Sequence, residues 1–107
     1  MPESVLLVIT TCPDEVVAKH IAHELVAAKL AACVQIYPGL QSIYQWLGEI
    51  CEAPELALHI KCLLSQYPAV QQKVLELHPY DVPELLALPV TLGLPSYFEW
   101  IKDTTQP

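Results

Sequence analysis

Residues 76–85, ELHPYDVPEL, limit the fold of this chain more than any other segment, because no helix can run through them. The residue before a proline is pushed out of helical geometry, so His78, which precedes Pro79, should end a helix. A second proline, Pro83, keeps the following turn stiff. Further polar side chains in this corner are Tyr80, Asp81 and Glu84. Such a corner indicates either a binding site or an interface between chains, and the sequence leaves both alternatives open.

The first third of the chain has the pattern of a strand followed by a helix. Residues 4–11, SVLLVITT, form an apolar run that is typical of a central strand buried on both faces. The overlapping residues 11–15, TCPDE, offer a capping side chain, a first-turn proline and acidic residues, so a helix should begin here. The apolar stripe of this helix is expected to contain Val17, Ile21, Leu25 and Ala28.

The middle of the chain predicts a long hairpin. Residues 31–37 have the pattern of a second strand, which bends at Pro38-Gly39 and resumes over residues 40–46. Leu47-Gly48 has the composition of a hairpin tip, and the return strand is clearest over residues 55–62. On that return strand, apolar side chains alternate with those of Glu55, Ala57, His59 and Lys61.

The last third of the chain predicts a second helix, an edge strand and a short closing helix. Ser65 is expected to cap a helix that runs to the proline corner at Leu77. Residues 85–92 form the last strand, and Pro89 inside it favours an edge position because proline donates no backbone hydrogen bond. Residues 96–102 carry the aromatic side chains of the closing helix. The inner side chains of the second helix should be Tyr67, Val70, Val74 and Leu77.

These elements follow one another in the order β-α-β-β-α-β, which is the ferredoxin-like arrangement of an α+β protein. In that topology the fourth strand lies at an edge of the sheet, which is where Pro89 is expected on separate grounds. We therefore predict a single domain over residues 1–107, with a long hairpin between its second and third strands and a short C-terminal helix.

The apolar content predicts an oligomer. Hydrophobic residues make up 53% of the chain, which is high for a soluble monomer of this size. The apolar runs are much shorter than the roughly 20 residues that a membrane span needs, and the N-terminus lacks the pattern of a secretory signal. We expect the surplus apolar surface to lie in a subunit interface, and we expect no membrane partner.

The charge of the chain argues against nucleic acid as a partner. The formal net charge is −7, and all basic residues are lysines, so the chain would mostly repel phosphates. An acidic surface favours cations, although acidity alone is not specific. The enzyme classes that share this fold also find little support, because acylphosphatases hold phosphate with an arginine and this chain has none. No phosphate-binding glycine loop is present either, and we expect no catalytic activity.

The cysteines point to a reducing compartment. The four cysteines form no C-x-x-C pair, so neither a zinc knuckle nor a thioredoxin-like motif is present. Because the chain is long enough to form a core without cross-links, reduced thiols and a cytoplasmic location are expected.

Several short motifs follow one another along the chain: PDE after the first strand, AACV at 31–34, SIY-x-W-x-G at 42–48, HPY at 78–80 and VPEL at 82–85. Together they resemble the CutA family of divalent-cation tolerance proteins. Each motif is weak by itself, but the ordered set is specific and covers the chain from about Val5 to Trp100. The resemblance implies a tight homotrimer similar in shape to PII-type signalling proteins, with a link to copper tolerance and no agreed catalytic activity. It also implies a cytoplasmic location in bacteria, or an organellar or secretory setting in some eukaryotes.

The resemblance also implies copper(II) binding, with some differences in this chain. In the bacterial pattern a cysteine on the first strand and a pair of histidines before the proline contribute ligands. Here Thr10 takes the place of that cysteine, and Leu77-His78 takes the place of the pair, so only His78 matches. Glu49 stands where a lysine usually follows the hairpin glycine.

Three residues are candidates for binding copper(II) or another divalent cation, and no cofactor is expected to be required. His78 is the leading candidate, with the alternative that its ring interacts with the end of the preceding helix. Cys33 lies among small residues on a strand, and a buried free cysteine often behaves as a small apolar side chain. Cys12 lies at the expected start of the first helix, where the dipole would lower its thiol pKa.

A second group of residues is expected to form a cleft between subunits. Tyr44 and Trp46 share one face of the hairpin, and exposed aromatic side chains there indicate contact with another chain or with a ligand. The complete group comprises Tyr44, Trp46, Glu55, Lys61, Tyr80 and Glu84. The sequence thus supports a metal-responsive homotrimer, with two alternatives: a PII-like sensor that binds a small molecule in these clefts, or a non-catalytic trimeric scaffold.

Overall fold

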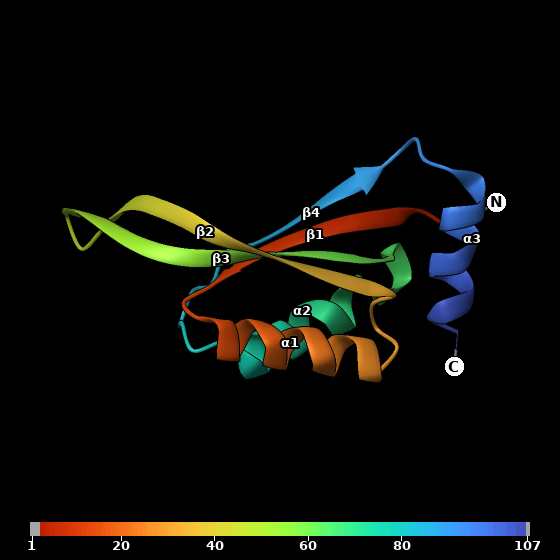
Figure 1. Cartoon of the computed structure of the whole chain (residues 1–107), viewed down its shortest axis with the longest axis horizontal. Helices are drawn as coiled ribbons and strands as arrows, with labels where there is room; N and C mark the ends of the chain where they lie inside the picture. The colour runs from red at the N-terminus through yellow and green to blue at the C-terminus, as the bar shows by residue number, and fades with distance from the viewer. Residues whose placement is uncertain (1–2, 107) are drawn as a thin grey trace.

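The computed structural model describes residues 3–106 and confirms the predicted order of elements (Figure 1). A four-stranded antiparallel sheet has the strand order β2-β3-β1-β4, which is the ferredoxin-like topology. The strands are β1 (Val5–Cys12), β2 (Cys33–Trp46), β3 (Glu49–Leu63) and β4 (Leu85–Val90). The helices are α1 (Glu15–Ala27), α2 (Tyr67–Leu77) and α3 (Pro95–Thr104), with a 3-10 turn at Leu64–Gln66.

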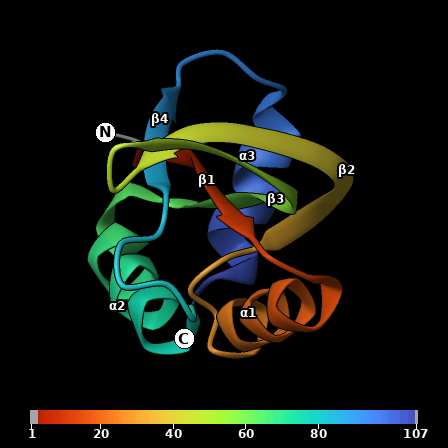
Figure 2. The ribbon, with the colours of Figure 1, turned by 90° about the vertical axis from the view of Figure 1, so that its left-hand side faces the viewer.

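Helices α1 and α2 lie side by side under one face of the sheet, which we call the covered face (Figures 1 and 2). Alternate residues of the central strands point toward these helices because successive side chains of a strand lie on opposite faces. Val8 of β1, Leu58 and Ile60 of β3 and the inner residues of both helices are fully buried there. The predicted inner residues Ile21, Leu25, Val70 and Val74 are among them. Ala28 was predicted to join them, but it is exposed because it lies just past the end of α1.

The opposite face of the sheet has little cover, and we call it the open face. Only α3 packs against it, at the end away from the hairpin, where Ile101 joins Val5 and Leu63 in a small second core (Figure 1). Along the rest of this face, most side chains of β1, β3 and β4 are partly or largely exposed, apart from Thr11 and Glu55 next to the arm. Leu86 and Leu88 of β4 are examples, with 58% and 46% of their surface accessible.

The hairpin of β2 and β3 extends well beyond the rest of the sheet (Figure 1). We call residues 40–55 the arm, and it begins at the bulge between Tyr37 and Leu40 that Pro38-Gly39 predicted. Leu47 and Gly48 form the tip, with φ angles of 51° and 81°. Both angles lie in the left-handed region, as the two central residues of a tight hairpin turn require. With the arm included, the molecule measures 47 × 26 × 23 Å.

Several predicted boundaries need correction. β1 continues through Cys12, and the cap of α1 is Asp14, whose Oδ1 accepts a hydrogen bond from the backbone N–H of Val17 at 2.9 Å. Pro13 therefore precedes the helix instead of occupying its first turn. Ser65 does not cap α2, because it lies inside the 3-10 turn that leads into the helix.

The ends of the chain also differ from the prediction in length. β4 ends at Val90, two residues before the predicted end at Leu92, and α3 is longer than the predicted 96–102. The edge position of β4 is confirmed, since it pairs only with β1, and Pro89 lies opposite Leu6. Within the described part of the chain, no helix is long and apolar enough to cross a membrane.

Candidate functional site

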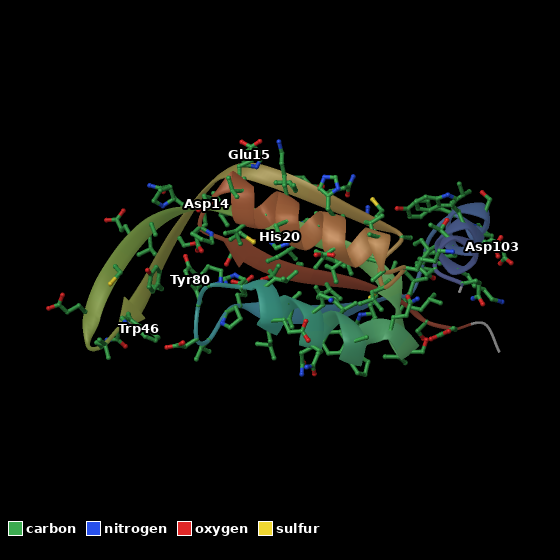
Figure 3. The ribbon with its side chains drawn as sticks, turned by 90° about the horizontal axis from the view of Figure 1, so that it is seen from below. Asp14, Glu15, His20, Trp46, Tyr80 and Asp103 are labelled. Atoms are coloured by element: carbon green, nitrogen blue, oxygen red, sulfur yellow. The ribbon has the colours of Figure 1, made fainter. Side chains whose placement is uncertain are left out.

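A cavity of about 690 Å³ lies where the arm meets the loop between α2 and β4. The arm contributes Ser42, Ile43, Tyr44 and Trp46, and the loop contributes residues 80–84. Thr11 at the end of β1 and Glu55 at the base of the arm complete the lining. In Figure 3, which shows the molecule from below, Trp46 lies near the end of the arm and Tyr80 lies beside the loop. The cavity thus collects residues from three distant parts of the sequence.

The lining of this cavity is acidic. It includes the carboxylates of Glu55, Asp81 and Glu84, and no lysine or histidine is among its residues. The remaining lining is mostly apolar or aromatic, with Tyr44, Trp46 and Tyr80 supplying the rings. We call it the acid cavity, and its charge suits a ligand that is positively charged.

His78 holds the start of the loop against β1. Its Nε2 lies 2.7 Å from the backbone oxygen of Thr11, and its Nδ1 accepts a hydrogen bond from the backbone N–H of Tyr80 at 3.2 Å. Because Nδ1 accepts, the ring proton is on Nε2 and is donated to Thr11. The ring is nearly inaccessible to solvent, at 7%. Both nitrogens are therefore occupied, which fits the alternative of a structural histidine, and metal binding through His78 stays a prediction.

Thr10 holds the other end of the loop. Its fully buried hydroxyl donates a hydrogen bond to the backbone oxygen of Glu84 at 2.6 Å. Thr10 and Thr11 are consecutive residues of β1, so the loop between α2 and β4 is hydrogen-bonded to this strand at both of its ends. The stiff corner predicted from residues 76–85 is therefore the wall of a cavity, with its two ends attached to one strand.

Glu55 and Tyr80 connect the arm to the loop. The hydroxyl of Tyr80 donates a hydrogen bond to Oε2 of Glu55 at 3.3 Å. Partial burial and the neighbouring Glu55 carboxylate both raise the pKa of Tyr80 above its usual value, so the phenol keeps its proton and remains a donor. The ring of Tyr80 also packs against the His78 ring, with their centroids 4.8 Å apart.

Lys61 does not join the other residues of the predicted cleft within this chain. Its Nζ donates a hydrogen bond to Oε1 of Gln35 at 2.7 Å and lies 5.7 Å from the centre of the Tyr97 ring. Tyr97 belongs to α3, which stands at the end of the sheet away from the arm (Figure 1). The other five predicted cleft residues, Tyr44, Trp46, Glu55, Tyr80 and Glu84, all line the acid cavity.

The three predicted metal ligands do not form a cluster within the described residues. Cys12 ends β1 in the covered core, and burial raises its thiol pKa to about 11, so the expectation of a lowered pKa at a helix start was wrong. Cys33 begins β2 and is half-buried. Within residues 3–106, no three His, Cys, Asp or Glu side chains lie close enough together to hold a metal ion. A site with three protein ligands would therefore need side chains beyond those that the described residues of one chain bring together.

Sequence reasoning passed over the two threonines that anchor the loop and the side chains of Ser42 and Ile43 in the cavity. A signal for Thr10 was present, because a hydroxyl residue lies near the end of an otherwise apolar strand. A buried polar side chain must find a hydrogen-bond partner, and here the partner is the backbone oxygen of Glu84 in the loop. Thr11 takes part through its backbone oxygen, which no side-chain pattern reports.

Comparison with known proteins gives a consistent result. The sequence model of the family described as "CutA1 divalent ion tolerance protein" matches residues 6–104. A Thermus thermophilus protein named "Divalent-cation tolerance protein CutA" is 46% identical over 99 residues, which cover 92% of this chain and 96% of the relative. A mouse protein named "Protein CutA" is 44% identical over 106 residues, or 99% of this chain and 60% of the longer relative.

The fold has close counterparts among solved structures. The crystal structure of CutA1 from the psychrotrophic bacterium Shewanella sp. SIB1 has a TM-score of 0.92 with this chain, at 49% sequence identity, and covers 97% of each chain. A similarity of this extent includes the arm and the C-terminal helix as well as the sheet.

Proposed function

The chain belongs to the CutA1 divalent ion tolerance protein family, and we propose that it acts in the response to divalent cations as a homotrimer that catalyses no reaction. The observation that carries this proposal is the acid cavity, whose carboxylates and lack of basic residues favour a cationic ligand. The names of the relatives refer to tolerance of divalent cations, and copper(II) is the divalent cation that we propose as the ligand.

The proposed trimer has support from the open face of the sheet. An apolar strand surface that no helix covers would be costly to leave in water, and monomers rarely expose large apolar patches. Leu86 and Leu88 lie on this face together with the half-buried Ile9 of β1. Burial of this face against other copies would also place a neighbouring chain next to the arm, where side chains from that chain would complete a metal site. The free state of all four cysteines supports a reducing compartment, and we propose the cytoplasm.

Copper(II) titration of the reduced protein tests the metal function. The titration compares the unchanged chain with His78→Ala and with His23→Ala, which removes an exposed imidazole from α1 and serves as the control. We expect saturable binding that His78→Ala weakens about tenfold or more, since loss of a ligand or of its support costs that much. The trimer is checked by light scattering on the same samples. Equal copper binding by all three proteins would show that His78 does not contribute to the site. Absence of binding by all three would refute copper(II) as the ligand.

A second candidate function is that of a PII-like sensor of a small molecule, and the size of the acid cavity favours it. About 690 Å³ is far more than a metal ion needs and falls in the range of small-molecule sites, roughly 300–1,000 Å³. The aromatic side chains of Tyr44 and Trp46 in its lining also suit an organic ligand better than a bare ion. For this candidate the ligand would bind at the cavity of each subunit, beside the neighbouring chain.

A further inference from the structure

Glu55 carries a charge that its own chain does not balance. Its side chain lines the acid cavity although only 8% of the residue surface is accessible. A buried carboxylate is costly unless a cation or several hydrogen bonds compensate it. The ion pairs of residues 3–106, taken to 4.0 Å, do not include Glu55. Among the described residues its one hydrogen bond is the 3.3 Å contact from the Tyr80 hydroxyl to Oε2, so Oε1 has no partner there and keeps some access to solvent.

The surroundings of Glu55 match the requirements of an organic cation. Tyr44 and Trp46 on the arm, and Tyr80 on the loop, present aromatic rings to the same cavity. A ring face attracts an ammonium group electrostatically, and its apolar surface also packs against a carbon frame. Asp81 and Glu84 add negative charge at the loop side of the cavity. Because no lysine or histidine of this chain belongs to the lining, the chain itself offers an anion no opposite charge in the cavity.

We propose that the acid cavity binds a small organic cation, in which an ammonium group is carried on an apolar or aromatic frame. The ammonium group pairs with the Glu55 carboxylate, and the frame lies among the side chains of Trp46, Tyr44 and Tyr80. This inference rests on the second proposed function, a small-molecule sensor, and it names the class of ligand that the sensor recognises.

Two other sources of positive charge fit the structure less well. A bare metal ion needs several donors close together, and within the described residues no three suitable side chains come near enough. Lys61 lies on the same strand as Glu55, but its amine is already bonded to Gln35 and placed over the Tyr97 ring. An organic ammonium ion supplies the missing charge in a cavity that is large enough to admit it.

Calorimetric titration with three ligands of one shape tests the charge requirement. Benzylamine carries an ammonium group on an aromatic frame, benzyl alcohol is its neutral counterpart and benzoate is anionic. We expect the complete reduced protein to bind benzylamine at neutral pH, to bind benzyl alcohol about thirtyfold more weakly or not at all, and not to bind benzoate. Equal binding of benzylamine and benzyl alcohol, preferential binding of benzoate, or no binding of benzylamine would each overturn the proposal.

A matched pair of variants tests the assignment to Glu55. Glu55→Gln removes the charge but keeps the shape and an oxygen that accepts the Tyr80 hydrogen bond. Glu52→Gln removes a charge from an exposed position on the same strand, outside the cavity lining. We expect Glu55→Gln to weaken benzylamine binding about thirtyfold and Glu52→Gln to change it less than about twofold. Equal effects of the two variants would overturn the role of Glu55.

Two further measurements on the same samples distinguish a failure of this inference from a failure of the proposed function. Light scattering reports whether the chain is a trimer, and copper(II) titration reports the metal function, and neither result depends on benzylamine. If Glu55 instead pairs with a lysine of a second copy, Glu55→Gln will destabilise the trimer while the unchanged chain fails to bind benzylamine, and the proposal is then wrong. A trimer that binds copper(II) but not benzylamine would also overturn the inference while the metal function stands.

Discussion

The two faces of the sheet consist of alternate residues of the same strands, yet they have different environments. On the covered face, Leu58 of β3 is completely inaccessible beneath α1 and α2. On the open face, Leu86 of β4 keeps 58% of its surface accessible, although every residue of its strand is apolar. Only α3 covers part of that face, at the end away from the arm (Figure 1).

This difference explains the apolar surplus of the composition. A ferredoxin-like chain of this length needs one apolar sheet face for the core under its helices, and in this chain much of the β1 and β4 part of the opposite face is apolar as well. The covered face therefore stabilises the fold of the single chain, whereas the open face is available for assembly. Because successive side chains of a strand alternate between the two faces, one set of strands can provide the core of the chain on the covered face and a proposed subunit interface on the open face.

The same substitution on each face gives the largest expected contrast. Leu58→Asp places an unpaired carboxylate in the covered core and should cost about 5 kcal/mol or more, enough to unfold the chain. Leu86→Asp places the same group at an accessible position, so the chain should fold, but the proposed trimer should be lost because three new charges meet in its interface. Circular dichroism measures folding, and light scattering measures mass.

A milder variant keeps this comparison measurable if Leu58→Asp yields no protein. Leu58→Ala should lower the free energy of unfolding by about 2–5 kcal/mol, because it leaves a cavity under the helices. Urea unfolding measures this loss. A variant Leu86→Asp that retained the mass of the unchanged chain would show that the open face is not the interface.

Two thiols on the covered face predict a loss of stability at alkaline pH. Burial raises the pKa of both Cys12 and Cys62 from the ordinary value of 9.0 to about 11. Above pH 9 the unfolded chain releases these protons while the folded chain retains them, so the free energy of unfolding falls as the pH rises from 9 to 11. The expected loss is about 2 kcal/mol for each thiol across this range.

Urea unfolding as a function of pH measures the contribution of these thiols. The double variant Cys12→Ala, Cys62→Ala should show a shallower decline than the unchanged chain, since tyrosines and lysines titrate in both. Cys33→Ala serves as the control because it keeps both buried thiols. Parallel curves for the double variant and the unchanged chain would mean that these thiols are not held in their neutral form by the core.

The fold could be predicted because each element has a strong local signal. The alternation over residues 55–62, the helical stripe that includes Ile21 and Leu25, and the prolines at the element ends are all local patterns. The boundary between β1 and α1 was predicted less well, because residues 11–15 contain more than one possible cap. Only packing decides that the strand continues through Cys12 and that Asp14 is the cap.

The candidate site was predicted in part, because strand alternation gives the face of a residue but not its position along the strand. Glu55 and Lys61 share a face, yet six residues at about 3.3 Å each separate them by about 20 Å, so they cannot meet within one chain. The hydrogen bond from His78 to Thr11 joins residues 67 positions apart. No local pattern reports such a contact, and for that reason the structural role of His78 emerged only from the fold.

The smallest predicted effect concerns Thr10, where the covered face meets the loop that forms the acid cavity. Its hydroxyl is buried and donates to the backbone oxygen of Glu84, so Thr10→Val removes one hydrogen bond at nearly constant volume. Glu84 is exposed, and water can partly replace the lost donor, so we expect a loss of about 1 kcal/mol in the free energy of unfolding. Thr91→Val, at an exposed position after β4, is the control and should change this free energy by less than about 0.5 kcal/mol.

Because Thr10→Val leaves the covered core unaffected, amide exchange should quicken in the loop and at the start of β4 but not in α1. Faster exchange in α1 as well would show that Thr10 supports the covered core, and that the two faces are less independent than their burial indicates.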